Sequence, residues 1–164
     1  AVIHQPELLF LDEPTSAVDP ESRRDFWEKL FELADAGTTL LVSTHYMDEA
    51  ERCHRIAILD RGVLVADGTP AELTARLAGR TLVVDADPPR QAARVLAACA
   101  GVASAAQIGN RPRVLLDPGA AQAPLAEALQ AAGIAARMQP QSASLEDVFV
   151  AATRQRPAAA RDEA

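Results

Sequence analysis

The feature that most constrains this chain is an apolar run that ends abruptly in two carboxylates. Residues 8–11 are Leu-Leu-Phe-Leu, and Asp12, Glu13 and Pro14 follow directly. A continuous apolar run without alternation is typical of a strand buried on both faces, as in a parallel sheet covered by helices. Such sheets bind ligands beyond the carboxyl ends of their strands. The run therefore predicts metal-assisted phosphate chemistry at this edge, in which one carboxylate holds Mg²⁺ and its neighbour orients a water.

A helix is predicted to follow this strand, from Asp19 to about Ala36. Asp19 can cap the free amides, Pro20 suits the first helical position, and Gly37 offers the left-handed residue that ends the helix. Apolar residues recur at three- and four-residue intervals and predict a stripe against the sheet: Phe26, Trp27, Leu30, Phe31, Leu33 and Ala34.

A second buried strand is predicted over residues 38–43, which are β-branched and apolar. This strand would deliver Thr44 and His45 to the sheet edge that carries Asp12 and Glu13. The two strand ends thus predict one shared site.

A short acidic helix is predicted next, from about Met47 to Cys53. Its carboxylates are Asp48, Glu49 and Glu51. Such a face is more often merely solvated than functional, although contact with a partner protein is an alternative.

The first two motifs resemble those of a known family. Residues 8–20 resemble the Walker B strand and following D-loop of ABC-type ATPases, and Ser43-Thr44-His45 resembles their switch histidine. Residues 45–51 and 144–149 are similar to the subgroup that powers ABC-2-type exporters of drugs or polysaccharides. The resemblance implies a P-loop NTPase-like parallel sheet with flanking helices, and it implies ATP and Mg²⁺ as cofactors.

The resemblance also implies roles for four residues. Asp12 is expected to hold Mg²⁺, directly or through a water, and Glu13 is the candidate general base. His45 is expected to contact the γ-phosphate and the catalytic water. Asp19 is a helix cap and, by resemblance, a D-loop group that reaches the nucleotide site of an opposing subunit. The alternatives are a strand-end cap for Asp12, a surface acid for Glu13 and a satisfied core histidine for His45.

Two expected parts of the family pattern do not occur in the sequence. A P-loop needs Gly-x-x-x-x-Gly-Lys-[Ser/Thr], and the only lysine is Lys29, within the predicted amphipathic helix. No segment resembles the Leu-Ser-Gly-Gly-Gln signature either. The chain is therefore expected to be the C-terminal part of a longer ATPase subunit, inactive alone and binding ATP weakly or not at all. One further departure from the family pattern is Ala17, where the family usually has glycine. Alanine is expected to keep ordinary φ values, so the fine geometry of the D-loop is expected to differ from that of the family.

Composition narrows the partners. The formal charge of −7 and the pI near 4.9 argue against a nucleic-acid partner, which needs a basic face. No apolar run approaches the roughly 18 residues that span a bilayer. The expected partners are an ABC-2-type membrane permease and a second ATPase subunit, with a cytoplasmic location at the inner face of the membrane.

A domain boundary is predicted near Gly79, because aromatic residues then vanish until Phe149 and alanine dominates. Residues 1–78 are assigned to an incomplete ATPase domain, residues 79–153 to a small α+β accessory domain and residues 154–164 to a frayed tail. The predicted order of strands and helices in residues 79–153, βαββαβ followed by a last helix, suggests a ferredoxin-like unit. The predicted elements after residue 54 are strands 55–60 and 63–67, helix 70–77, strand 80–85, helix 89–100, strands 103–108 and 113–116, helix 124–132, strand 134–139 and helix 144–153.

Two other functions stay open at this point. The chain could be a non-catalytic interaction or regulatory module derived from an ABC ATPase. It could also serve DNA repair or translation, since ATPases of those processes share the strand-to-carboxylate motif, although the acidic charge counts against this. The transported substrate and the direction of transport are not encoded in these residues.

Overall fold

A computed structural model describes residue 3 and residues 5–154 of the chain. Contacts within the chain divide it into two units, one up to Ala50 and one from Glu51 onward. The predicted boundary near Gly79 lies within the second unit and stays a prediction. Of the predicted tail, residues 155–164 lie outside the described residues.

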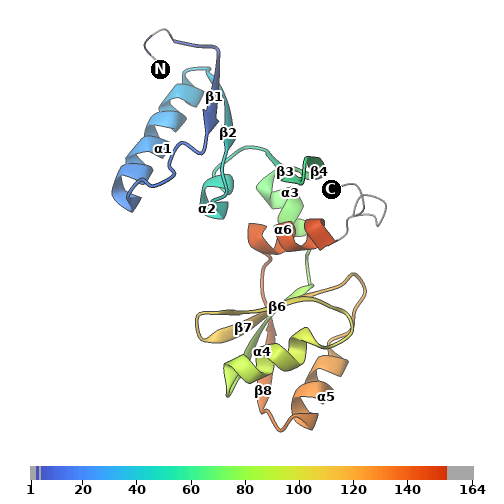
Figure 1. Cartoon of the computed structure of the whole chain (residues 1–164). Coiled ribbons are helices and arrows are strands. Elements are labelled where there is room, and N and C mark those ends of the chain that lie inside the picture. Colours follow the sequence, from blue (N-terminus) through green and yellow to red (C-terminus); the bar gives the residue numbers. More distant parts are fainter. Residues whose placement is uncertain (1–2, 4, 155–164) are drawn as a thin grey trace. The chain divides into compact units, whose positions relative to one another are not determined.

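The first unit is a parallel strand pair with one long helix. Strand β1 (Leu8–Asp12) pairs in parallel with β2 (Thr39–Ser43), and helix α1 (Pro20–Asp35) connects them (Figure 1). A short helix, α2 (Met47–Ala50), follows β2. The parallel sheet, the crossover helix and both strands were predicted, and the structure confirms them.

Helix α1 begins and ends where its sequence signals predict. The Asp19 side chain accepts a hydrogen bond from the Ser22 amide at 3.0 Å, and Gly37 adopts a φ of +99° after the last turn. Trp27 and Leu30 are buried. Part of the predicted apolar stripe therefore packs where α1 contacts β2, whereas Phe31, which was also predicted to face the sheet, is 36% exposed.

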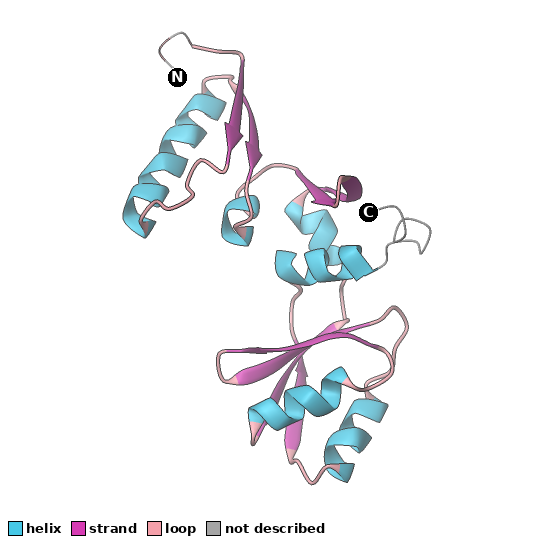
Figure 2. Ribbon diagram, in the orientation of Figure 1, coloured by secondary structure: helices cyan, strands magenta, loops and turns pink. Residues whose placement is uncertain are grey.

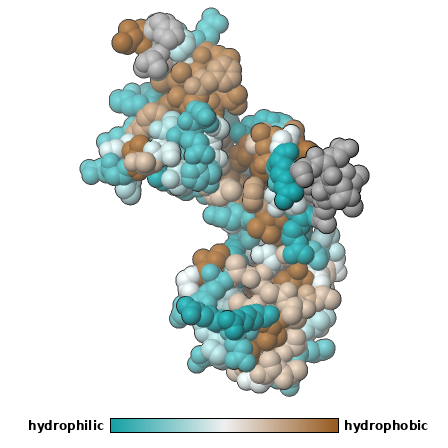
Figure 3. Space-filling model, viewed as in Figure 1, coloured by the Kyte–Doolittle hydropathy of each residue, from teal (hydrophilic) through white to brown (hydrophobic). Residues whose placement is uncertain are grey.

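The opposite face of the strand pair is exposed, which corrects the prediction that the first strand is buried on both faces. Phe10 is 66% exposed and its cross-strand neighbour Leu41 is 59% exposed. Figure 3 shows apolar surface in the region of these strands. The physical reason is that α1 covers one face only, while a run that is apolar at every position cannot show which face is covered.

The second unit starts with a hairpin and a short helix. Strands β3 (Ile56–Asp60) and β4 (Val63–Gly68) are antiparallel. Both turn residues, Arg61 and Gly62, have positive φ, as a tight two-residue hairpin requires. Helix α3 (Pro70–Ala75) follows, and a capping box between Thr69 and Glu72 starts it.

A four-stranded antiparallel sheet forms the rest of the second unit (Figure 2). Its strands lie in the order β6-β7-β5-β8, and the central strand β5 is antiparallel to both of its neighbours. Helices α4 and α5 pack on this sheet over a core that includes Leu82, Leu96 and Leu129. The bounds are β5 Thr81–Ala86, α4 Pro89–Ala97, β6 Val102–Ile108, β7 Arg111–Leu116, α5 Ala123–Ala131 and β8 Ala136–Pro140.

The last helix, α6 (Leu145–Arg154), contacts α3 and β4 as well as β6. Arg113 of β7 pairs with Asp147 of α6 at 2.5 Å, and the Asp147 carboxylate also accepts from the Ser144 amide at 2.9 Å. The helix is thus anchored to the four-stranded sheet through a mostly buried ion pair. Among the described residues, no helix has the length and apolar character that crossing a bilayer requires.

Candidate functional site

The parallel pairing of β1 and β2 builds the candidate site at their carboxyl ends. Asp12 lies opposite Ser43 in the register, and the Glu13 amide donates to the Ser43 carbonyl at 2.9 Å. Both strands end at this level, and Glu13 is the first residue after β1 while His45 is the second residue after β2. The structure therefore brings the predicted Glu13 and His45 together.

Glu13 and His45 form a direct pair. His45 Nδ1 lies 2.7 Å from Glu13 Oε2, and the two side chains are 57% and 43% exposed. A neutral imidazole that donates through Nδ1 presents Nε2 as an acceptor, and a protonated one presents it as a donor. The pair thus joins a carboxylate to a ring that can face an oxygen ligand in either protonation state.

The backbone of Glu13 is strained. Its φ is +42°, a left-handed conformation that a residue with a side chain adopts at a cost. The strain places the carboxylate at the sheet edge beside His45. Such outliers cluster at sites where geometry matters for function.

Asp12 is the exposed end of β1, and its carboxylate accepts a hydrogen bond from the Ser43 hydroxyl. The described residues contain no group of three or more His, Cys, Asp or Glu side chains that could hold a metal ion. This donor set still fits Mg²⁺, because Mg²⁺ beside a nucleotide takes one or two carboxylates and completes its shell with phosphates and waters. Asp12 and its hydroxyl neighbour supply oxygen ligands only.

Asp19 is an N-cap, as predicted. The hydrogen bonds from Ser22 lower the pKa of the Asp19 carboxyl, which keeps it ionised at the positive end of α1. The structure places it at the start of the helix, and its D-loop role toward a second subunit stays a prediction.

Comparison with known proteins adds an independent observation. No family model matches the chain. The chain is 51% identical over 78 residues to the probable multidrug ABC transporter ATP-binding protein YbhF of Escherichia coli K12, which is 48% of this chain and 14% of YbhF. It is 43% identical over 106 residues to the daunorubicin/doxorubicin resistance ATP-binding protein DrrA of Streptomyces peucetius, which is 62% of this chain and 32% of DrrA. It is 44% identical over 84 residues to the linearmycin resistance ATP-binding protein LnrL of Bacillus subtilis 168, which is 51% of this chain and 27% of LnrL.

Its homologues are ABC transporter ATP-binding proteins. The resemblance to ABC transporter ATP-binding proteins is thereby confirmed. The chain spans between 14% and 32% of the length of these three relatives.

The one lysine of the sequence lies on the surface of α1. Lys29 on α1 pairs with Glu32 at 2.8 Å, and both side chains are exposed. The pair raises the pKa of the Lys29 ammonium through the Glu32 carboxylate. Lys29 is therefore a surface residue of the helix, as its position in the sequence predicts.

The loop between β1 and α1 has a glycine-like backbone conformation at Ala17. Its φ is +60°, so the expectation that alanine holds ordinary φ values is wrong. The hydrogen bonds from Ser16 and Val18 amides to Glu13 and Thr15 carbonyls close the surrounding turns and impose this conformation. The local turn geometry thus overrides the preference of the alanine side chain.

Sequence reasoning missed Glu49. The acidic face of α2 was interpreted as solvated, but Glu49 is only 1% exposed. The correction has a physical cause: hydroxyl donors and the Arg23 guanidinium surround its carboxylate. A signal was present, because Arg23 lies four residues before Trp27 on the apolar stripe of α1, and a cation there needs a buried anion.

Proposed function

We propose that this chain is part of an ATP-hydrolysing subunit of an ABC transporter and carries its Walker B, D-loop and switch-histidine segments. One observation carries the proposal: Glu13 and His45 meet at 2.7 Å beyond the carboxyl ends of two parallel strands. This edge is where open parallel sheets bind their ligands. The homology to ABC transporter ATP-binding proteins supports the same assignment.

Glu13 orients the attacking water and accepts its proton. Its carboxylate acts as the general base, and general-base catalysis typically contributes a factor of about 10² to 10⁴ to the rate. His45 fixes that carboxylate through Nδ1 and presents Nε2 toward the terminal phosphate. Asp12 would hold Mg²⁺, and the bound ion would offset the charge that develops on the phosphate oxygens.

The proposal places the remaining nucleotide contacts in other segments of a longer protein. The sequence contains no P-loop, so we expect the 164-residue chain to bind ATP weakly or not at all. The exposed apolar face with Phe10 and Leu41 is the face that such segments would cover. Calorimetric titration of the isolated chain tests this, and micromolar ATP binding would contradict it.

The partners follow from the same proposal. The subunit drives an ABC-2-type permease, in the export direction, and works with a second ATPase subunit toward which Asp19 extends the D-loop. It acts on the cytoplasmic side of the membrane through the permease. The multidrug and drug-resistance names of YbhF and DrrA support a transporter of this kind.

The second unit contains a distinct accessory element under this proposal. Residues 79–153 form a ferredoxin-like accessory domain, and the strand order β6-β7-β5-β8 with the βαββαβ chain order supports that class. Its role is regulation of, or contact with, a neighbouring subunit.

The proposed function is tested with Glu13→Gln in the full-length protein. We expect turnover to fall by about 10² or more while nucleotide binding persists, because the amide keeps the shape but cannot accept the proton. Glu51→Gln, on an exposed carboxylate of the same charge, is the matched control and should leave turnover unchanged. An unchanged ATPase rate in Glu13→Gln would refute the role of Glu13.

A further inference from the structure

Glu49 of α2 is a buried carboxylate that the proposed hydrolysis does not itself use. It is 1% exposed. The Thr15 hydroxyl donates to its Oε1 atom, and the Thr44 hydroxyl donates to its Oε2 atom at 2.7 Å. Each carboxylate oxygen is therefore bound to a different loop.

The two threonines flank the proposed catalytic pair. Thr15 lies in the turn that begins at Glu13, and Thr44 directly precedes His45. Glu49 thus bridges the chain after Glu13 to the chain before His45, in parallel with the 2.7 Å contact between those two side chains.

The loop of His45 is fixed on both sides of the ring. Thr44 Oγ1 accepts a hydrogen bond from the Tyr46 amide at 3.1 Å. The Tyr46 ring lies 4.1 Å from the His45 ring, between centroids. The Thr44 hydroxyl therefore joins Glu49 to the backbone of the residue that stacks beside the imidazole.

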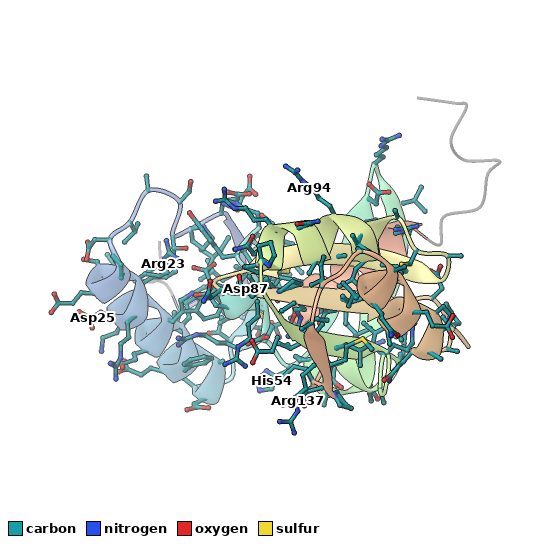
Figure 4. The ribbon with its side chains drawn as sticks, turned by 90° about the horizontal axis from the view of Figure 1, so that it is seen from below. Arg23, Asp25, His54, Asp87, Arg94 and Arg137 are labelled. Atoms are coloured by element: carbon teal, nitrogen blue, oxygen red, sulfur yellow. The ribbon has the colours of Figure 1, made fainter. Side chains whose placement is uncertain are left out.

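Arg23 completes the cluster from α1. Its guanidinium lies 4.2 Å from the centroid of the Tyr46 ring, and its Nε lies 3.8 Å from Glu49 Oε1. Figure 4 shows Arg23 and the exposed Asp25 on different sides of α1. The helix thus contributes one cation that touches both the anion and the ring beside His45.

The charge of Glu49 sets the direction of the hydrogen bonds that it forms with the two threonine hydroxyls. Burial alone would raise the pKa of the Glu49 carboxyl, but hydrogen bonds from Thr15, Thr44 and Trp27 and the charge of Arg23 outweigh it and lower the pKa. An ionised carboxylate only accepts hydrogen bonds, so both threonine hydroxyls must point at it. Their side chains, and the loops that carry them, are thereby held in one orientation.

We propose that Glu49 is a positioning residue, which ties the turn after Glu13 to the loop before His45 and so sets the contact between those two side chains. The catalytic consequence rests on the proposed ATP hydrolysis. The structural consequence concerns this chain alone and can be measured without nucleotide.

The structural arm uses the 164-residue chain and NMR. In wild type we expect a directly observed Nδ1 proton of His45 and nuclear Overhauser contacts from its ring to the Glu13 side chain. Glu49→Ala should lose both, whereas Glu49→Gln should retain the contacts, because its amide keeps the length and a threonine hydroxyl can reverse to accept. Glu51→Gln is the charge-matched control and should behave as wild type. Unaltered His45 signals in a folded Glu49→Ala chain would overturn the proposal.

A second variant keeps the test decisive if Glu49→Ala does not fold. Thr44→Val removes one hydroxyl at nearly constant volume and cuts the bridge on the His45 side only. We expect it to lose the same ring contacts to Glu13. Retention of those contacts in a folded Thr44→Val chain counts against the proposal.

The kinetic arm uses the full-length protein. Glu49→Ala should lower kcat by about 10- to 100-fold with KM for ATP little changed, since a displacement of about 1 Å can cost 10² in rate. Glu49→Gln should recover part of the loss. Leu30→Ala, in the core of α1 and outside the bridge, is the stability control and should not produce this kcat loss.

The two arms separate the two failures. If the full-length wild type does not hydrolyse ATP, the proposed function fails, and the NMR arm still decides whether Glu49 positions His45. If wild type hydrolyses ATP and Glu49→Ala keeps its kcat, the proposed function stands and the positioning role is refuted.

Discussion

Ala17 offers the sharpest test of the backbone in the loop between β1 and α1. Its φ is +60°, and its side chain is exposed. A left-handed conformation costs an L-residue about 1–2 kcal/mol relative to glycine. Glycine in turn loses about 0.4–1 kcal/mol more conformational entropy on folding. Since no buried methyl is removed, Ala17→Gly should stabilise the first unit by about 0.5–1 kcal/mol.

The measurement is urea unfolding followed by the fluorescence of Trp27. Trp27 is the single tryptophan of the chain and is 3% exposed within the first unit, so its signal reports that unit. With an m value of about 1 kcal/mol/M for so small a unit, the midpoint should rise by about 0.5–1 M.

The matched control is Ala36→Gly, at the C-cap of α1. Ala36 is also exposed, but its φ is −77°, so glycine brings only its entropy cost and should lower the midpoint. Midpoints that move in the same direction for both variants, at unchanged m, would refute the reasoning from φ.

Three further predictions concern charge and packing. Hydrogen bonds hold the pKa of the Glu49 carboxyl below its ordinary value of 4.5, so its contribution to stability is present above that pH and is lost as pH falls through the folded pKa. The urea midpoint measured by Trp27 fluorescence should therefore fall on acidification below about pH 4.5. The fall should be less steep in Glu49→Gln, which has no carboxyl group to titrate at this position. Leu82 of β5 is fully buried, so Leu82→Ala should cost about 2–5 kcal/mol in thermal unfolding by circular dichroism, whereas Leu64→Ala, at a side chain 55% exposed, should cost far less. Arg113→Ala removes the cation that pairs with the mostly buried Asp147 carboxylate and should destabilise the anchoring of α6 by about 3–5 kcal/mol. The loss is measured as reduced hydrogen-exchange protection in α6. Arg113→Lys should show the same reduced protection, because lysine lacks the two-pronged donor geometry of arginine.

The parts of this fold that sequence predicts well have local signals. Asp19 and Pro20 start α1 and Gly37 ends it, and Arg61-Gly62 makes the β3–β4 turn. Each signal acts through backbone groups within a few residues, so no knowledge of distant packing is needed.

The meeting of Glu13 and His45 was predictable for a different reason. The two residues are far apart in sequence, but Glu13 directly follows β1 and His45 is the second residue after β2. The helix between the two strands makes them parallel neighbours. Parallel pairing then brings the residues after both strands to the same edge. Topology alone therefore carried this prediction, while the chemical roles of the residues stay a proposal.

The side chains that support this pair were not predictable in the same way. Glu49 and Asp48 are adjacent acids in one short helix, yet Glu49 is buried and Asp48 is exposed. What separates them is the position of Arg23 and two threonine hydroxyls on other elements. Burial of a charged group depends on partners in space, which composition and periodicity do not specify.

The same distinction explains why the apolar run of β1 predicts more burial than the structure has. Leu9 and Phe10 are both apolar, and in a strand they point to opposite faces. In this unit only the face of β1 that carries Leu9 is partly buried, since Phe10 on the other face is 66% exposed. A sequence retains apolar residues on both faces when both are buried in the protein in which the strand works. The face of Phe10 and Leu41 is therefore the one to which our proposal assigns further segments of the nucleotide site.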